Sequence, residues 1–481
     1  MKLSLPASRT IRIFLIATLL PVVPAARGAI REHAQMKGPF TTVQEVTRAC
    51  LGCHQSEGMQ LLDSSHWTWK RERLVNGQKT SYSKASGLSF FAIQAQANPA
   101  TCRRCHPGNG GEDQADNQVD ASRIDCLVCH DTSGRHRLQA DPPAAPQELL
   151  DMARRVGRPD VTNCQTCHRD NCLAAAPGTT VQTIRDVHLQ PDGAAMRCQS
   201  CHMNKGRHAI VRLPLAAGEK EEPSRGCTTC HGENPHVLQE LNHHGELISC
   251  QACHIPFYGT GAPTLVSWNW LTGGNVPQLR QAGRDGRPVP LVRSDGFTLA
   301  TKVIPLYRWD NNSDHLYERG RRIDPTTVTL LQAPGKRTIH SQIRPFRVIY
   351  GIQLYDAKYR FLISPKLGTD PAERFPGPDW PTIAHQGMEA ARLPFSGQYG
   401  VTTTATLKRI NHGVVPASRA LNCLDCHTAN SRIPWQTLGY IEDPWRTETD
   451  SGKAGTSEQQ RPAQPTSPPI EEIILRPGDT L

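Results

Sequence analysis

The sequence predicts a mainly α and irregular fold, made of short helices and loops, with one segment that contains some β-strand. Three observations predict it. The five-residue pattern Cys-x-x-Cys-His occurs eight times in 481 residues. Hydrophobic residues make up 37% and aromatic residues 6% of the chain, which is lean for a protein of this length. Residues 255–422 lack the pattern and carry β-rich stretches among many Pro and Gly.

The repeated pattern predicts covalently attached haem. Two thiols three positions apart can each add to one vinyl group of a porphyrin, and the histidine that follows then reaches the iron as its proximal ligand. A zinc site would not need a histidine directly after every second cysteine, and a disulfide framework would not need the histidine at all. The pattern therefore indicates an octahaem c-type cytochrome, with short helices and loops around eight haem c groups. The copies are Cys50-Leu-Gly-Cys53-His54, Cys102-Arg-Arg-Cys105-His106, Cys126-Leu-Val-Cys129-His130, Cys164-Gln-Thr-Cys167-His168, Cys198-Gln-Ser-Cys201-His202, Cys227-Thr-Thr-Cys230-His231, Cys250-Gln-Ala-Cys253-His254 and Cys423-Leu-Asp-Cys426-His427.

Haem also explains the composition and the charge. Each porphyrin supplies a large apolar surface that replaces side chains in the core. A ferric haem with two histidine ligands contributes about −1, so eight haems shift the formal charge of +10 to roughly +2. The excess of basic residues is therefore internal neutralisation, and it does not indicate nucleic acid as a partner.

The first residues predict export. Lys2, Arg9 and Arg12 form a positive start, residues 11–23 are apolar but too few to span a bilayer comfortably, and small residues follow. We expect a signal peptide at residues 1–28 and a periplasmic mature protein. A retained N-terminal membrane anchor is the alternative. The redox partner would then be a periplasmic or membrane electron donor or acceptor.

The spacing of the copies divides the rest of the chain. Seven copies lie in one stretch at an average of one per ~30 residues, which leaves room for little beyond short helices and loops. The haem-free segment contains β-rich signals at residues 346–350 and 401–406, and we expect it to pack against the haem cluster. The expected parts are a haem-rich domain at 29–254, the haem-free segment at 255–422, the eighth haem site at 423–445 and a disordered tail at 446–481 that is rich in Ser, Thr, Gln, Glu and Pro.

The remaining histidines are candidates for the sixth ligands. A low-spin haem needs a second strong ligand, whereas a haem that binds substrate needs a weak or displaceable one. Twelve candidates face at most eight positions, so at least four are not ligands. They are His33, His66, His136, His188, His208, His236, His243, His244, His315, His340, His385 and His412.

Several stretches resemble the octahaem tetrathionate reductase family of periplasmic cytochromes more closely than the hydroxylamine oxidoreductases or octahaem nitrite reductases. The likeness runs from about residue 33 to about residue 445. The stretches are Lys37-Gly-Pro-Phe40, Ser65-His-Trp-Thr-Trp69, Asp125-Cys-Leu-Val-Cys-His-Asp-Thr132, Cys250-Gln-Ala-Cys-His-Ile-Pro256, Leu393-Pro-Phe-Ser-Gly397 and Ile410-Asn-His-Gly-Val-Val-Pro416.

The resemblance implies seven haems with two histidine ligands and one catalytic haem, attached at the second motif, with a lysine as its sixth ligand. His136, His243, His340 and His385 are then not ligands, and His315 is a candidate to line the catalytic pocket. The sixth ligands that the resemblance implies are His33, His66, His188, His208, His236, His244 and His412.

The sequence departs from this family at the catalytic haem. The family lysine is expected after the fourth motif, but no lysine occurs between Lys84 and Lys205, and the family's unpaired cysteine before the second motif is absent from residues 86–101. Cys172, just after the fourth motif, is instead the one cysteine outside the eight motifs. A thiolate there could ligate iron or exchange with a sulfur–sulfur bond. The alternative is a buried free thiol or an intermolecular bridge.

Two functions are consistent with these residues. The first is a reductase of small sulfur oxyanions such as tetrathionate, or of nitrogen oxyanions, at the second haem, with Cys172 and His315 in its pocket. Arg103 and Arg104, inside the second motif, would hold the anionic substrate, unless they only pair with haem propionates or face solvent. The second is an electron-transfer protein without substrate chemistry, which the missing lysine favours.

Overall fold

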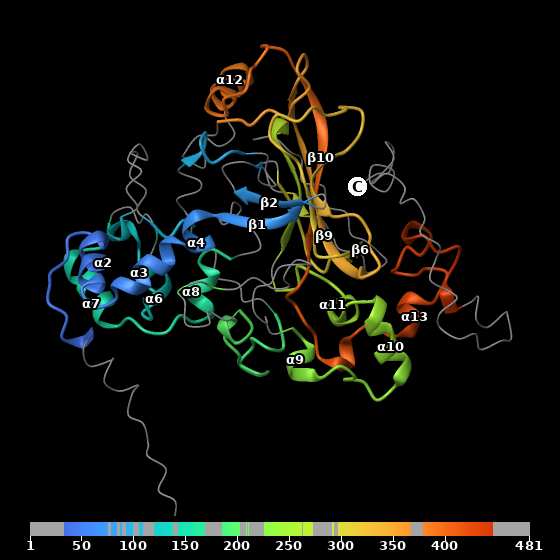
Figure 1. Cartoon of the computed structure of the whole chain (residues 1–481), viewed down its shortest axis with the longest axis horizontal. Helices are drawn as coiled ribbons and strands as arrows, with labels where there is room; N and C mark the ends of the chain where they lie inside the picture. Colours follow the sequence, from blue (N-terminus) through green and yellow to red (C-terminus); the bar gives the residue numbers. More distant parts are fainter. Residues whose placement is uncertain are drawn as a thin grey trace, which may run out of the picture.

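In the computed structural model, short helices and loops lie at both ends and along one side of a large β-sheet (Figure 1). The structure describes residues 33–75, 78–83, 87–88, 93–99, 105–108, 120–136, 138, 143–168, 185–202, 208, 210, 226–261, 263–272, 291–292, 297–366 and 379–445. The expected signal peptide and tail lie outside these residues. None of the helices within the described ranges is both long enough and apolar enough to cross a bilayer.

The sheet has ten strands, and its centre is a long antiparallel pair. β9 (Gln342–Asp356) and β10 (Tyr399–Arg409) pair over eleven positions, from Tyr399 opposite Asp356 to Arg409 opposite Phe346. The path through the sheet is β2-β1-β7-β8-β10-β9-β3-β5-β4, and β6 pairs with β9 off this path. The other strands are β1 (Lys70–Val75), β2 (Gln78–Ser83), β3 (Thr264–Asn269), β4 (Leu291–Val292), β5 (Phe297–Ala300), β6 (Leu306–Asp310), β7 (Asp314–Leu316) and β8 (Thr329–Pro334).

The β-rich signals at residues 346–350 and 401–406 are confirmed, because they lie in β9 and β10. The expectation of a mainly α and irregular fold is confirmed only in part. The sheet is larger than expected and includes the β1–β2 hairpin, which comes from the expected haem-rich domain and joins the sheet where Val75 pairs with Asp314. The sequence of β1, Lys-Arg-Glu-Arg-Leu-Val, does not alternate between apolar and polar residues, so the period-two signal of a strand is absent.

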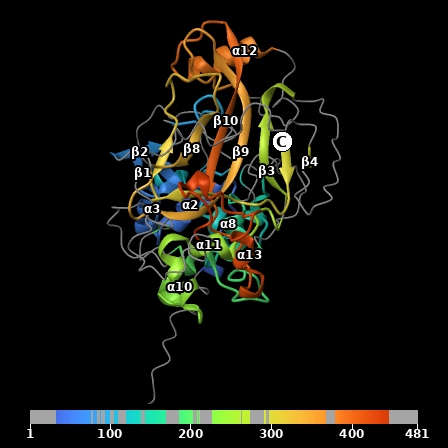
Figure 2. The same ribbon diagram turned by 90° about the vertical axis from the view of Figure 1, so that its right-hand side faces the viewer.

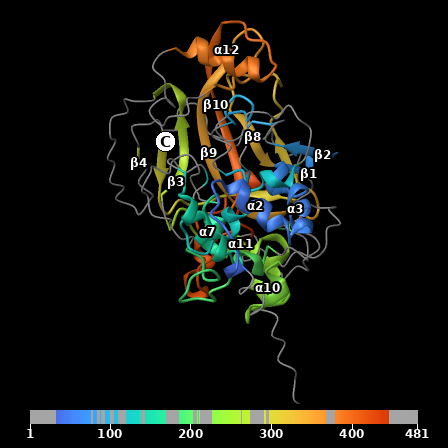
Figure 3. The same cartoon turned by 90° about the vertical axis from the view of Figure 1, so that its left-hand side faces the viewer.

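The helices are short, and most of them surround the Cys-x-x-Cys-His motifs. α12 packs at one end of β9 and β10, whereas α10, α11 and α13 lie at the other end (Figures 2 and 3). The helices are α2 (Val43–Leu51), α3 (Gln55–Leu62), α4 (Ser65–Thr68), α6 (Leu127–His130), α7 (Pro146–Arg154), α8 (Val161–Gln165), α9 (Thr228–His231), α10 (Gln239–Leu247), α11 (Cys250–His254), α12 (Trp380–Ala390) and α13 (Cys423–Cys426), with 3-10 turns at Ala121–Arg123, Cys198–Ser200, Trp270–Thr272, Ala417–Arg419 and Gln436–Leu438.

Several small apolar clusters hold these parts together. Val46 of α2 packs with Leu127 of α6 and Met152 of α7 near the first and third motifs. Ala252 of α11 packs with Tyr307 of β6 and Trp435, which ties the seventh and eighth motifs to the sheet. The backbone N–H of Ser249 also donates to the carbonyl of Ile343 in β9 at 3.0 Å. The sheet is therefore the frame on which the last two motifs are fixed.

Candidate functional site

Each described motif forms one helical turn. In six motifs the backbone N–H of the histidine donates to the carbonyl of the first cysteine at 2.9–3.1 Å, as in His130 to Cys126 and His427 to Cys423. This i to i−4 bond is the repeating bond of an α-helix. The turn places both thiols and the imidazole on neighbouring positions of one local surface, which is the arrangement that covalent haem attachment requires.

Seven of the eight motif histidines face a second histidine from elsewhere in the chain. The centres of the two rings lie 5.7–6.1 Å apart in every case. The pairs, with the motif histidine first, are His54 with His33, His130 with His208, His168 with His66, His202 with His412, His231 with His188, His254 with His236 and His427 with His244.

These separations fit an iron atom between the rings. An imidazole nitrogen binds a metal at about 2 Å and the ring centre lies roughly 1 Å behind it, so two imidazoles on one iron have centres about 6 Å apart. The seven second histidines are the seven sixth ligands that the family resemblance implies. No three His, Cys, Asp or Glu side chains come together as an all-protein metal site in the described part of the chain. The geometry suits haem, whose porphyrin leaves only two positions for the protein.

Hydrogen bonds at the Nδ1 atoms orient several of these rings. His130 Nδ1 lies 2.8 Å from the carbonyl of Gly157, and His427 Nδ1 lies 2.6 Å from Asp443. His188 Nδ1 lies 2.9 Å from Asp186. A proton on Nδ1 that is held in this way leaves Nε2 for the metal. Burial lowers the pKa of His130, which favours the neutral, metal-binding imidazole.

The second motif differs from the other seven. His106 contacts two tryptophan rings, with ring centres 4.9 Å from Trp67 and 5.3 Å from Trp69, and its ring has no histidine partner at the 6 Å spacing among the described residues. Its Nε2, not its Nδ1, lies 2.8 Å from the carbonyl of Trp67. Burial lowers the pKa of His106, and the bond to Trp67 opposes this shift only in part. A Cβ on Gly108 would lie 2.6 Å from the Trp67 ring, so glycine allows this close approach.

Neighbouring motifs contact one another. The side chains of Cys50 and Cys126 lie close together between the first and third motifs, as do those of Cys164 and Cys198 between the fourth and fifth and those of Cys227 and Cys250 between the sixth and seventh. Six of the eight motifs therefore lie in three adjacent pairs.

The second and fourth motifs also touch, because the Cys167 thiol lies 3.7 Å from the carbonyl of Cys105. α4 strengthens this link, since its His66 faces the fourth motif while Trp67 packs on His106. The second motif is thus fixed beside the fourth by both backbone and side-chain contacts.

Asp186 joins the fifth and sixth motifs. One carboxylate oxygen accepts from His188, and the other accepts from the backbone N–H groups of Gly413 and Val414 at 2.9 and 3.0 Å. Gly413 directly follows His412, so one carboxylate supports a ligand candidate of each motif. Burial raises the pKa of Asp186, but these hydrogen bonds outweigh burial and lower it overall. Neither Asp186 nor Asp443 was expected from the sequence. The short spacing between Asp186 and His188 is a local signal for Asp186, but the sequence around Asp443 has no such signal.

The other histidines have different partners. His136 Nε2 lies 2.7 Å from the buried carboxylate of Asp125, and the ring of the exposed His385 packs edge-on against Phe395. His243 is exposed and lies 3.5 Å from Glu246, and His340 is exposed. His315 lies in β7, beside β8, where it pairs with Ala333. The residues Cys102, Arg103, Arg104 and Cys172 lie outside the described residues.

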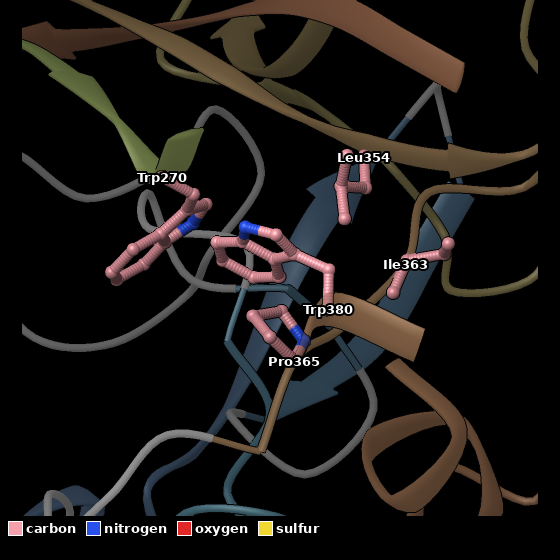
Figure 4. Close-up of a pocket in the computed structure, with 5 residues that line it drawn as sticks. All are labelled: Trp270, Leu354, Ile363, Pro365 and Trp380. Carbon is pink, nitrogen blue, oxygen red and sulfur yellow. The ribbon is translucent and has the colours of Figure 1, made fainter. Parts of the chain in front are cut away.

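One small pocket lies in the described residues away from the motifs. It is shallow and partly open, and it is lined by Trp270, Leu354, Ile363, Pro365 and Trp380 (Figure 4). All five lining residues are apolar or aromatic and none is titratable, so the pocket offers no group for acid–base, nucleophilic or metal chemistry.

Eight attachment motifs, seven histidine pairs and the small apolar clusters define a multihaem c-type cytochrome. A sequence model described as "Cytochrome c bacterial" matches residues 265–430, from β3 through the eighth motif. The crystal structure of octaheme cytochrome c from Shewanella oneidensis is similar, with 33% sequence identity over 86% of this chain and 98% of that chain and a TM-score of 0.75. A comparison with curated proteins found no match. The chain belongs to the octahaem c-type cytochrome family, and its cofactor is covalently attached haem c.

Proposed function

We propose that this cytochrome is a periplasmic reductase of small oxyanions, with tetrathionate as the first candidate and nitrogen oxyanions as the second, and that the second haem is its catalytic site. The observation that carries the proposal is the difference between His106 and the other motif histidines. Seven have a histidine partner at a spacing that suits six-coordinate iron, whereas His106 has two tryptophans instead. A haem without a second histidine is the one that can accept substrate.

The contacts between motifs support a continuous path for electrons. The first motif touches the third, and Asn163, in the helix that contains the first cysteine of the fourth motif, donates to the carbonyl of Asp131 beside the third at 2.9 Å. From the fourth motif the row continues to the fifth, then through Asp186 to the sixth, and from there to the seventh. The backbone N–H of Leu421, just before the eighth motif, donates to the carbonyl of Cys253 in the seventh at 3.0 Å, and the second motif joins at the fourth. The second haem is then a side branch that receives electrons from the row.

For tetrathionate, two electrons break the central S–S bond and give two thiosulfate dianions, and no atom is left over. The haem attached at the second motif would supply these two electrons from the row of haems. Arg103 and Arg104 hold the anion by charge, since guanidinium groups pair well with oxyanions. Cys172 takes the place of the lysine that the family resemblance implies, and His315 lines the pocket. Trp67 and Trp69 pack on His106 and would exclude water from the side of the site where this histidine lies.

An electron-transfer protein without substrate chemistry is the second candidate. The lysine-free stretch between Lys84 and Lys205 favours it, because the family's sixth ligand has no direct equivalent there. In that case a second strong ligand would close the second haem. Both candidates place the protein in the periplasm, where it exchanges electrons with a periplasmic or membrane partner.

Stopped-flow reoxidation tests the proposal. The fully reduced protein is mixed without oxygen with tetrathionate, nitrite or hydroxylamine, and haem oxidation is followed by absorbance. We expect tetrathionate to oxidise the haems, and Cys172→Ala to slow this reaction at least tenfold and to change the ferric spectrum of one haem. Asn171→Ala, one residue away, is the control and should behave as wild type.

The electron-transfer candidate predicts a different outcome. None of the three compounds would reoxidise the haems faster than buffer, and Cys172→Ala would have a wild-type spectrum. Rapid reoxidation by tetrathionate with an unchanged rate in Cys172→Ala would keep the reductase and remove the cysteine from its mechanism.

A further inference from the structure

The ring of His427 is enclosed by one carboxylate and two tryptophan rings. Asp443 Oδ1 accepts from Nδ1 at 2.6 Å and also from the backbone N–H of Trp445 at 3.1 Å. Trp435 stacks on the ring with centres 5.8 Å apart, and Trp445 meets it edge-on at 4.8 Å. Trp435 is itself fixed, since its Nε1 donates to the carbonyl of Cys426 at 3.0 Å.

The carboxylate in this enclosure is buried. The side chain of Asp443 is 6% exposed and that of His427 is 12% exposed. The second carboxylate oxygen, Oδ2, is buried and has no hydrogen-bond partner among the described residues. In a site of low dielectric, the charge of a carboxylate acts strongly on its hydrogen-bond donor. The imidazole of His427 therefore carries more electron density than one bonded to a neutral carbonyl, such as His130 with Gly157.

We propose that Asp443 is a positioning residue that lowers the reduction potential of the eighth haem. A more electron-rich imidazole stabilises ferric iron relative to ferrous iron, and hydrogen bonds to axial ligands are a principal means by which proteins set haem potentials. The inference rests on the ligation of the eighth haem by His427 and His244 in the proposed function. It also predicts the direction of electron flow. The eighth haem, at the end of the row farthest from the second motif, has a low reduction potential, and electrons move from it toward the second haem.

Asp186 offers a partial parallel at the sixth haem. Its Oδ1 lies 2.9 Å from Nδ1 of His188, but its other oxygen shares its charge with two backbone N–H groups. Asp443 has no such second set of donors on Oδ2. The eighth haem is therefore expected to show the larger effect.

Potentiometric titration of the intact octahaem protein tests the proposal. Asp443→Asn keeps an oxygen for the Nδ1 proton but removes the charge. We expect the reduction potential of one haem to rise by about 59 mV, which is a tenfold change in a one-electron redox equilibrium. Glu442→Gln, an exposed neighbour that also loses one negative charge, is the control and should leave every potential unchanged. His244→Ala identifies the eighth haem, because loss of that ligand makes its haem high-spin.

Asp443→Glu is the second variant and keeps the test decisive if the asparagine variant does not mature. It retains a carboxylate near Nδ1, so the potential should stay low. The proposal is overturned if Asp443→Asn leaves every reduction potential unchanged. It is also overturned if Asp443→Glu raises the potential of one haem by as much as about 59 mV, a tenfold change in the redox equilibrium. An unchanged spin state in His244→Ala would instead contradict the ligand assignment of the proposed function, so the two failures are distinguishable.

Discussion

Asp186 supports two ligand candidates at once. Its carboxylate holds the ring of His188 and the backbone just after His412, and these histidines face different motifs. A hydrogen bond to a buried carboxylate is worth more than one between neutral groups, and a buried donor left without a partner costs about 1–3 kcal/mol. One substitution at this position therefore affects two haems.

We expect Asp186→Ala to disturb the spectra of the fifth and sixth haems together and to lower the free energy of unfolding by at least about 2 kcal/mol, because four donors lose their acceptor. Ferric absorption and guanidinium unfolding measure the two effects. Asp192→Ala, at an exposed position in the same loop, is the control. A change confined to one haem would show that Asp186 does not link the two ligands.

At the scale of elements, the pairs differ in how their rings are turned. The two ring planes are near parallel in five pairs, with angles of 16–39°. They are near perpendicular in His66 with His168, at 76°, and in His188 with His231, at 70°. α4 fixes His66 and the Asp186 bond fixes His188, so each angle is set by a local element.

The angle between two axial imidazoles controls the splitting of the iron d orbitals. We therefore expect the ferric protein to give two electron paramagnetic resonance signals with a large maximum g value, from the fourth and sixth haems, and five rhombic signals. His66→Ala should remove one of the two large-g signals, whereas His385→Ala, which alters a histidine packed on Phe395, should remove none. Seven rhombic signals would contradict the ring geometry.

Some of these elements can be predicted from the sequence and others cannot. The motif turns follow from local chemistry, because attachment itself demands the spacing of cysteine and histidine. The β-rich segments of β9 and β10 were recognisable from their β-branched residues, but the polar β1–β2 hairpin was not, since its place in the sheet comes from pairing with β7. The pairing partners of the motif histidines could be named only through the family resemblance, because spacing says nothing about which distant histidine meets which motif.

At the scale of the whole molecule, the β-sheet and the row of haem motifs form one structural unit. Arg409, at the end of β10, pairs with Asp310 at 2.6 Å and Asp314 at 2.8 Å, and His412 follows three residues later. Burial alone would lower the pKa of Arg409, but the two carboxylates raise it overall, so the residue stays charged. The strand that anchors the sheet therefore also delivers a ligand candidate to the fifth motif, which explains why the haem-free segment belongs to the same unit as the haems.

The central claim is that seven haems have two histidine ligands and that the haem at the second motif does not. Near-infrared magnetic circular dichroism of the ferric protein tests this most directly, because the energy of its charge-transfer band depends on the pair of axial ligands. We predict bands that correspond to seven haems with two histidines and one further band of a different ligand pair or of a high-spin haem. Intensity for eight haems with two histidines, and no other band, would contradict the claim.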